Sequence, residues 1–299
     1  MASIAVSVII PVYNREFELK RAIVSVLKQS IQNFEIIVVD DFSQVDIKAV
    51  IESFKDLRIL YFRLPKKGNA NVSRNIGIAA AKGEYTAMLD SDDEWLPNHL
   101  EAKIKFIEEN KLDGTFGGFF IDNGETKSKI ISRPLKENEL MVNYLLSDGV
   151  AVTPSHVYKT ICAKQVLWDE TLNRHQDLDF SVRFAQQFKF QPSCDISCIV
   201  HWKKGEARST DFDSQINFIE KNKNAIDSTI YSSYHRIIYS KIRDRKDVDI
   251  KFKKHYLLES IKNIKILSLT DFLSCYGNNL SVFKRLYLRF IFVVRVILS

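Results

Sequence analysis

The chain has few of the residues that build disulfide frameworks and zinc sites. Its 299 residues include four cysteines and six histidines. Cys162, Cys194, Cys198 and Cys275 have neither the regular spacing of a disulfide framework nor the paired Cys/His spacing of a zinc site. We therefore expect reduced thiols and no zinc, which suits a cytoplasmic location.

Linkers and repeats are missing as well. The sequence shows no Gly/Ser-rich tract, low-complexity segment or internal repeat. A strand-like run begins at residue 6 with no basic leader before a long apolar segment, so we expect no signal peptide. With 45% hydrophobic residues, the chain can form one large domain, which we place at residues 1–235, and a helical appendage at residues 236–299.

Acidic residues are scarce near the C-terminus. Residues 241–299 hold 13 lysines and arginines against five acids, whereas residues 1–240 hold 30 against 32. The net charge of +6 therefore comes from the C-terminal part. This part resembles no nucleic-acid-binding module, and we expect no nucleic-acid partner.

The first ninety residues alternate between two hydrophobic patterns. Continuous apolar runs, typical of buried strands, occupy residues 6–12, 34–39, 59–62 and 85–89. Helical spacing lies between them, at residues 19–27, 45–54 and 71–81. This alternation predicts an α/β fold with a mostly parallel sheet flanked by helices.

Polar clusters follow three of these strands, at residues 13–14, 40–41 and 90–93. Ligands of such sheets collect beyond the carboxyl ends of the strands, so we expect the three clusters to share one crevice. Within 90–93, Asp90 and Asp92 stand at i and i+2. Such carboxylates can share Mg²⁺ or Mn²⁺, with substrate phosphates as further ligands. The same Asp-Ser-Asp-Asp run also suits a turn or a helix N-cap.

Five segments carry a family resemblance. They are SVIIPVYN (7–14), VVDD (38–41), SRNIG (73–77), DSDD (90–93) and HQDLDF (175–180). In this order they resemble the family 2 glycosyltransferases of GT-A fold, over residues 5–210. The resemblance implies an enzyme that transfers a sugar from a nucleotide donor with inversion, using Mn²⁺ or Mg²⁺ and no covalent intermediate.

The resemblance also implies nucleotide contacts. It places Pro11, Tyr13 and Asn14 in the nucleotide-binding loop, with Tyr13 against the base. Asp41 would accept from a pyrimidine imide N–H, which fits UDP or dTDP. Arg74, near a helix N-terminus, would donate to the diphosphate. The structural alternatives are a loop anchor for Tyr13, an N-cap for Asp41 and a surface position for Arg74.

Carboxylates supply the remaining chemistry implied. Asp90 would face the ribose or the metal, Asp92 would bind the metal, and Asp93 would brace the loop. The cation would neutralise charge on the leaving diphosphate. Asp177 would be the base that deprotonates the acceptor hydroxyl, but Gln176 stands where the family usually has glutamate, which puts the tuning of that base in doubt. Alternatively, Asp177 is an acid stabilised by a helix dipole.

Downstream residues extend the candidate site. In related enzymes a loop often closes over the donor here, so Arg208 and Ser209 would reach the diphosphate and His201 would approach the metal. A lone histidine is more often a packing residue, and that alternative stays open for His201. Residues 154–156 are expected to line the acceptor cleft.

The segment 280–299 carries four cations and no acid: Lys284, Arg285, Arg289 and Arg295. At about 100° per residue they fall in one arc of a helix. Charges inside a bilayer are unfavourable, whereas anionic lipid attracts a basic helix that lies in the interface. We expect attachment to a membrane surface, the alternative being a helix packed on the catalytic domain with its cations solvated.

These features predict a metal-dependent inverting transferase that moves a hexose or N-acetylhexosamine from a UDP-sugar to a glycan acceptor. The acceptor would be lipid-linked, for surface polysaccharide assembly at the cytoplasmic face of the membrane. A dTDP-sugar-using transferase and a nonenzymatic nucleotide-sugar-binding protein are the alternatives, although the latter would be expected to lose the carboxylates. A retaining enzyme would differ in product configuration. A processive synthase would need transmembrane helices and a Gln-x-x-Arg-Trp motif, and neither appears in the sequence.

Overall fold

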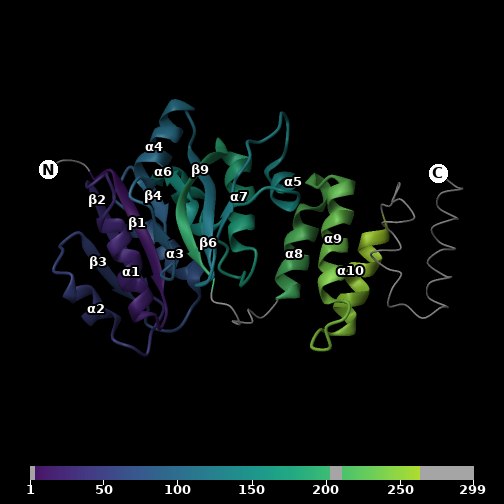
Figure 1. Cartoon of the computed structure of the whole chain (residues 1–299), viewed down its shortest axis with the longest axis horizontal. Helices are drawn as coiled ribbons and strands as arrows, with labels where there is room; N and C mark the ends of the chain where they lie inside the picture. The colour runs from purple at the N-terminus through teal and green to yellow at the C-terminus, as the bar shows by residue number, and fades with distance from the viewer. Residues whose placement is uncertain (1–3, 203–210, 263–299) are drawn as a thin grey trace, which may run out of the picture. The chain divides into compact units, whose positions relative to one another are not determined.

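The computed structural model describes residues 4–202 and 211–262 (Figure 1). The strands are β1 (Val6–Val12), β2 (Phe34–Asp40), β3 (Ile59–Arg63), β4 (Tyr85–Met88), β5 (Glu94–Trp95), β6 (Gly114–Asp122), β7 (Lys127–Ile130), β8 (Val157–Lys159) and β9 (Phe190–His201). The α-helices are α1 (Glu16–Leu27), α2 (Ile47–Ser53), α3 (Ala70–Ala80), α4 (His99–Glu109), α5 (Met141–Leu146), α6 (Thr160–Val166), α7 (Gln176–Gln187), α8 (Phe212–Asn222), α9 (Ser228–Ile242) and α10 (Ile250–Lys262). Two 3₁₀ helices are η1 (Thr153–Ser155) and η2 (Lys223–Ala225).

The chain divides into two compact units, Met1–Lys221 and Asn222–Ser299. A boundary after residue 235 would cut through α9. In the second unit α9 packs against α10, and the buried hydroxyl of Tyr231 donates to the Glu259 carboxylate at 2.8 Å. The basic segment 280–299 lies outside the described residues.

The sheet of the first unit follows the order β3-β2-β1-β4-β8-β6-β9-β5, with β7 paired to β6. The pairs β1–β2, β1–β4 and β2–β3 are parallel, which confirms the prediction for the first ninety residues. Beyond β4 the sheet is mixed, because β8 pairs antiparallel to both β4 and β6, whereas β6 and β9 are parallel. The predicted α/β architecture, a sheet flanked by helices, is confirmed.

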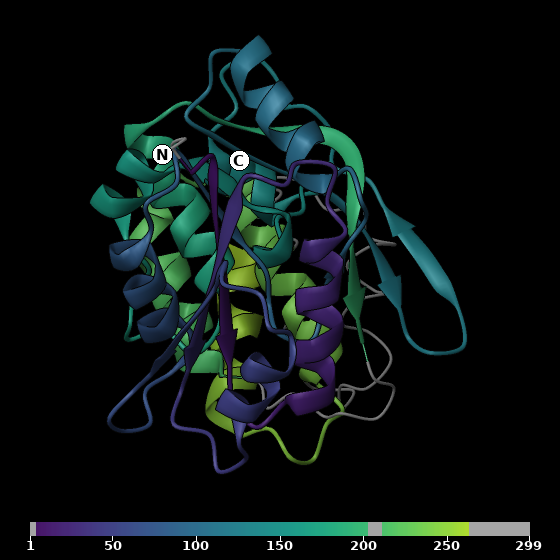
Figure 2. The same ribbon diagram turned by 90° about the vertical axis from the view of Figure 1, so that its left-hand side faces the viewer.

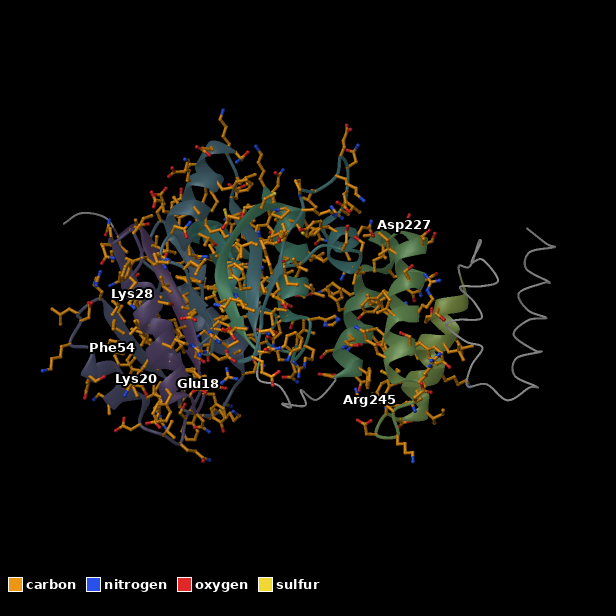
Figure 3. The ribbon with its side chains drawn as sticks, in the orientation of Figure 1. Glu18, Lys20, Lys28, Phe54, Asp227 and Arg245 are labelled. Atoms are coloured by element: carbon orange, nitrogen blue, oxygen red, sulfur yellow. The ribbon has the colours of Figure 1, made fainter. Side chains whose placement is uncertain are left out.

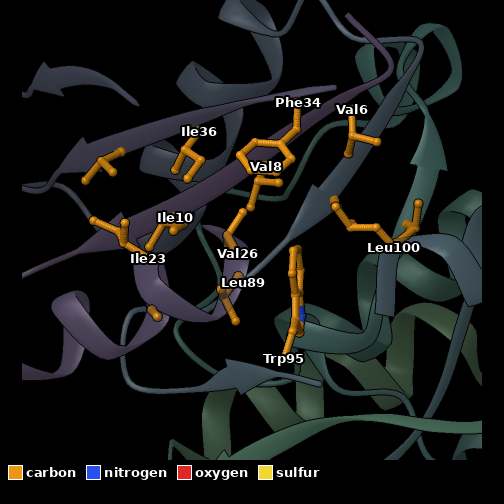
Figure 4. Close-up of a cluster of buried hydrophobic side chains, with 14 of the residues drawn as sticks. Val6, Val8, Ile10, Ile23, Val26, Phe34, Ile36, Leu89, Trp95 and Leu100 are labelled. Atoms are coloured by element: carbon orange, nitrogen blue, oxygen red, sulfur yellow. The ribbon is translucent and has the colours of Figure 1, made fainter. Parts of the chain in front are cut away.

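Helices cover both faces of the parallel strands, with α1 and α3 on opposite sides (Figure 2). Alternate residues of β1, such as Val8 and Ile10, pack in one core with α1, α2 and α4 (Figure 4). On α1, Ile23 and Val26 point into this core, while Lys20 and Lys28 lie on the exposed face (Figure 3). The helical period of apolar residues therefore determines which face of α1 is buried.

Helix α3 packs closely on the other face. An added Cβ on Gly77 would lie 2.4 Å from Cγ2 of Ile9, so only glycine allows this approach of α3 to β1. The helix begins at Asn69, whose side-chain oxygen accepts from the backbone N–H groups of Asn71 and Val72. This cap and this contact hold the first turns of α3 at the carboxyl end of the sheet.

Candidate active site

One cavity of about 500 Å³ lies beyond the carboxyl ends of β1, β2 and β4. Seven residues expected at the site line it: Pro11, Tyr13, Asp41, Arg74, Asp90, Asp92 and Asp177. They come from five segments that are far apart in the sequence. Two other expected residues, Asn14 and His201, do not line this cavity, and Arg208 and Ser209 lie outside the described residues.

Asn14 joins two loops instead of lining the cavity. It adopts a left-handed conformation, φ 52°, two residues after the end of β1. Its backbone N–H donates to the Ser43 hydroxyl at 2.9 Å, and its side-chain oxygen accepts from the N–H of Gln44 at 2.7 Å. Asn14 therefore connects the β1–α1 loop to the β2–α2 loop. It lies in the loop that the resemblance assigns to nucleotide binding, next to Tyr13.

Asp41 is almost fully buried, with 5% of its surface exposed. Its Oδ1 accepts from the Gly68 N–H at 2.6 Å, and its Oδ2 lies 3.8 Å from the ammonium of Lys67. That ammonium also lies 2.9 Å from the centre of the Tyr13 ring. The N-cap of α2 is Asp46, so the alternative of Asp41 as an N-cap is wrong.

Arg74 is also buried, with only 4% of its side chain exposed. Its guanidinium donates to Oδ1 of Asp90 at 2.7 Å, to Asn71 at 2.9 Å and to Gln176 at 3.3 Å. It also lies 4.6 Å from the ring of Trp168. The alternative of an ordinary surface arginine is therefore wrong, and Gln176 contributes a neutral acceptor to this buried network.

The run 90–93 forms a turn between β4 and β5. An Asp92 oxygen lies 2.9 Å from the guanidinium of Arg15, and the guanidinium of Arg21 donates to the Asp92 backbone carbonyl. Asp93 is buried, and its carboxylate accepts from the backbone N–H of His201 at 2.9 Å, in line with the expected bracing role. Burial raises the pKa of Asp93 well above its ordinary value, and the charges of Asp90 and Asp92 add to the rise.

The side chains of the cavity provide some of the oxygen ligands that a divalent cation such as Mg²⁺ needs. Asp90 and Asp92 offer carboxylate oxygens to one cavity, which fits the habit of Mg²⁺ of binding one or two carboxylates plus substrate phosphates. Within residues 4–202 and 211–262, no three His, Cys, Asp or Glu side chains gather as a protein-only metal cage would require. His201 instead lies 2.9 Å from the Glu94 carboxylate.

Asp177 enters the cavity from the first turn of α7. The helix begins after His175, which is left-handed with φ 58°, and the Asp177 carboxylate accepts from the N–H of Leu178 at 3.0 Å. Burial raises the pKa of Asp177 to about 6, whereas the Leu178 N–H and the charge of Arg74 act in the opposite direction. A helix dipole acting alone would lower this pKa, so burial dominates.

Two basic residues of the cavity were not expected. Arg15 and Arg174 both line it, together with Thr153 and Pro154 of η1. The indole N–H of Trp95 donates to the Pro154 carbonyl at 2.6 Å and holds this wall in place. In the sequence, only the positions of these two arginines indicate that they could reach the site. Arg15 directly follows the first polar cluster, and Arg174 precedes the HQDLDF segment.

A second cavity of about 350 Å³ adjoins the first, because Arg15 and Asp92 line both. Its other walls are the start of α1, the end of β6 and the end of β9. Lining residues besides the shared pair are Phe17, Glu18, Arg21, Asp122, Asn123, Gly124, His201 and Trp202. His201 therefore belongs to the second cavity.

The sequence is similar to those of known proteins. The sequence profile of glycosyl transferase family 2 matches residues 7–164. An uncharacterized glycosyltransferase of Methanocaldococcus jannaschii is 34% identical over 193 residues, 62% of this chain and 66% of that protein. An uncharacterized glycosyltransferase of Rickettsia bellii is 50% identical over 108 residues, 36% of this chain but only 16% of that longer protein.

A third relative has a specific name. It is WfgD of Escherichia coli, described as a UDP-Glc:alpha-D-GlcNAc-diphosphoundecaprenol beta-1,3-glucosyltransferase. It is 33% identical over 143 residues, which cover 48% of this chain and 55% of WfgD. The chain thus spans about half to two thirds of this relative and of the archaeal one.

Solved structures share the fold. TarS 1–349 of S. aureus, in complex with UDP-GlcNAc, has a TM-score of 0.59 at 21% identity, covering 92% of this chain and 76% of that one. The mannosyltransferase PcManGT of Pyrobaculum calidifontis, in complex with GDP-Man and Mn²⁺, has a TM-score of 0.52 at 13% identity, covering 85% and 68%. At these identities the likeness concerns the fold. Because the family profile covers more than half of the sequence, the chain belongs to glycosyl transferase family 2.

Proposed function

We propose that this protein is an inverting glycosyltransferase that moves a hexose or N-acetylhexosamine from a UDP-sugar to a glycan acceptor. The acceptor would be lipid-linked, and the product would enter surface polysaccharide assembly. The observation that carries the proposal is the meeting of Tyr13, Asp41, Arg74, the 90–93 turn and Asp177 around one cavity.

The nucleoside end of the cavity is formed by Tyr13 and Asp41. A carboxylate has two oxygens and about four acceptor positions, so Asp41 can accept from Gly68 and still accept from a pyrimidine imide N–H. This chemistry supports UDP or dTDP equally. WfgD is named for UDP-Glc and the TarS structure contains UDP-GlcNAc, and both names favour UDP.

The diphosphate would lie near Asp90 and Asp92. A divalent cation bound there supplies Lewis-acid stabilisation of the leaving diphosphate. Arg74 holds Asp90 in place through its 2.7 Å contact. The main role of this buried arginine would therefore be to position the Asp90 carboxylate, and direct hydrogen bonding to the diphosphate would be secondary. The Mn²⁺ in the PcManGT structure supports this cofactor proposal.

Asp177 would accept the proton of the acceptor hydroxyl. A carboxylate with a pKa of about 6 is a stronger base than an ordinary aspartate and is still ionised at neutral pH. Presence of both the cation carboxylates and this base favours an enzyme over a nonenzymatic binding protein.

The acceptor proposal draws on the name of one relative. WfgD is named for an acceptor linked to diphosphoundecaprenol. In the part of the chain described here, no helix has the length and apolar composition needed to cross a bilayer. We propose attachment to the cytoplasmic membrane surface through the basic segment 280–299.

A donor panel tests the function directly. UDP, dTDP and GDP sugars are each added with Mn²⁺, and hydrolysis of the donor and protection against thermal unfolding are measured. We expect UDP-sugars to give both effects. Absence of any hydrolysis, with protection retained, would favour the nonenzymatic alternative, and the anomeric configuration of a product separates inversion from retention.

A further inference from the structure

Arg15 stands between the two cavities and contacts the carboxylate proposed to bind the cation. Its Nη1 lies 2.9 Å from Oδ2 of Asp92, and both residues line both cavities. The side chain of Arg15 is 43% exposed and that of Asp92 is 22% exposed. Solvent screens an ion pair at such a position, so the contact exchanges readily.

The other arginine contacts of this turn are fixed. Arg74 is 4% exposed and is held by Asn71, Gln176 and the Trp168 ring while it contacts Asp90. Arg21 donates to the Asp92 backbone carbonyl. The two ion pairs thus differ, because the arginine that contacts Asp90 is buried, whereas Arg15, which contacts Asp92, is 43% exposed.

The backbone around Arg15 allows its side chain to move. Arg15 is the N-cap residue of α1 but makes no side-chain capping bond, so a change of its rotamer leaves the helix start intact. A guanidinium fork matches a phosphate as well as it matches a carboxylate. Arg15 therefore has two possible partners within one cavity: the Asp92 carboxylate and a bound diphosphate.

We propose that Arg15 is an exchangeable counter-ion of Asp92. In the nucleotide-free protein it pairs with the carboxylate, and when a divalent cation binds Asp92 the guanidinium moves to the diphosphate of the donor. The inference rests on the proposed function. It assigns Arg15 a role in diphosphate binding, and it makes Arg15 a competitor of the cation.

The exchange predicts opposite effects of one substitution on two ligands. Arg15→Met keeps the length of the side chain and removes its charge. Without nucleotide, the variant should bind Mn²⁺ about threefold to tenfold more tightly, because the competing ion pair is lost. With saturating Mn²⁺ it should bind UDP about tenfold more weakly, because a charge-assisted bond is lost.

Calorimetry on the full chain measures both affinities, with Mn²⁺ alone and then UDP as probes. Lys67→Met is the matched control for Mn²⁺, since it removes one charge beside Asp41, a carboxylate that lines the same cavity, instead of the charge beside Asp92. Arg15→Lys should recover part of the UDP affinity. Melting temperatures test whether each variant is folded. Because Arg15 is exposed, we expect its substitutions to keep the fold.

The outcomes separate the two proposals. If the wild type shows no Mn²⁺-dependent UDP binding, the proposed function is overturned and the exchange with it. If the wild type binds both ligands but Arg15→Met leaves Mn²⁺ affinity unchanged or lowers it, the exchange alone is overturned. If Lys67→Met raises the Mn²⁺ affinity as much as Arg15→Met does, the rise comes from the change in net charge, and the exchange is likewise overturned.

Discussion

Asp177 and Asp179 lie in the same turn of α7 but have different surroundings. Asp177 lines the cavity, whereas Asp179 is buried and contacts Arg183 and Lys221 at 2.7 and 2.9 Å. Local sequence does not separate these two acids. Tertiary packing places Asp177 at the cavity and Asp179 in a buried ion network.

Asp177→Asn should lose turnover and keep nucleotide binding, because an amide preserves the shape but cannot accept a proton. We expect a rate loss of about 10² to 10⁴ at saturating donor. Its melting temperature at pH 7.5 should not fall, since burial disfavours the charge that the substitution removes. Asp179→Asn is the contrast and should lower the melting temperature. Turnover of Asp177→Asn within threefold of wild type would assign the base elsewhere.

The pH profile follows from the same carboxylate. Its pKa is about 6, and the ionised form is the proposed base, so kcat/KM should be constant above pH 7 and fall by about tenfold per pH unit well below pH 6. Initial rates between pH 4.5 and 8.5 measure this, with stability checked at each pH. A profile that stays flat down to pH 4.5 would mean that no group with this pKa controls the rate.

Asp92→Ala should abolish Mn²⁺-dependent UDP binding and leave the fold intact, because the substitution removes a proposed ligand from a partly exposed turn. Calorimetry with UDP and Mn²⁺ measures the loss. Asp122→Ala, at a carboxylate that lines the second cavity and not the first, is the control and should keep the UDP affinity. Undiminished metal-dependent affinity in Asp92→Ala would remove Asp92 from the cation site.

At the level of elements, the close approach of α3 to β1 positions Arg74. Gly77→Ala would normally stabilise a helix by about 1 kcal/mol. Here the new Cβ meets Cγ2 of Ile9 at 2.4 Å, and we expect a net loss of about 1 to 3 kcal/mol in the free energy of unfolding. Urea denaturation measures it.

The Ile9→Ala background identifies the cause of that loss. Removing the Ile9 side chain creates the space that the new methyl needs, so Gly77→Ala should cost less there than in wild type. The same cost in both backgrounds would mean that backbone strain, and not this contact, is responsible.

At the scale of the whole molecule, the membrane proposal depends on segment 280–299. Deleting it should release the protein from anionic vesicles and reduce activity on a lipid-linked acceptor more than on a soluble analogue. Surface attachment raises the local acceptor concentration without changing the donor cavity. Vesicle cosedimentation at low and high salt measures it, since salt screens the attraction over a Debye length of about 8 Å at physiological ionic strength.

A charge-neutral variant is the control for the deletion. Replacing Lys284, Arg285, Arg289 and Arg295 by glutamine keeps the apolar residues and removes the charges. It should lose the salt-sensitive part of vesicle binding. Equal sedimentation of wild type and truncated protein would make the segment structural.

The sequence by itself determined the parallel half of the sheet and the position of three polar clusters at its carboxyl edge. Both follow from local properties of the chain, namely the period of apolar residues and the order of strands and helices. For the same reason Tyr13, Asp41 and Asp90 are predicted to meet, whereas the family resemblance adds Asp177, and all four line one cavity. Mixed pairing beyond β4 was not predicted, because it depends on how β6, β8 and β9 pair.

Only the tertiary structure decided the partners of the charged groups. Arg74 is buried against Asp90, Arg15 contacts Asp92, and His201 contacts Glu94 in a second cavity. Each pair joins residues from different segments of the chain, up to 107 positions apart. Such contacts depend on strand register and loop conformation, and the hydrophobic periodicity of the sequence contains no information about either. The sequence therefore predicts which residues reach the site, whereas the folded chain decides which of their charges are already paired there.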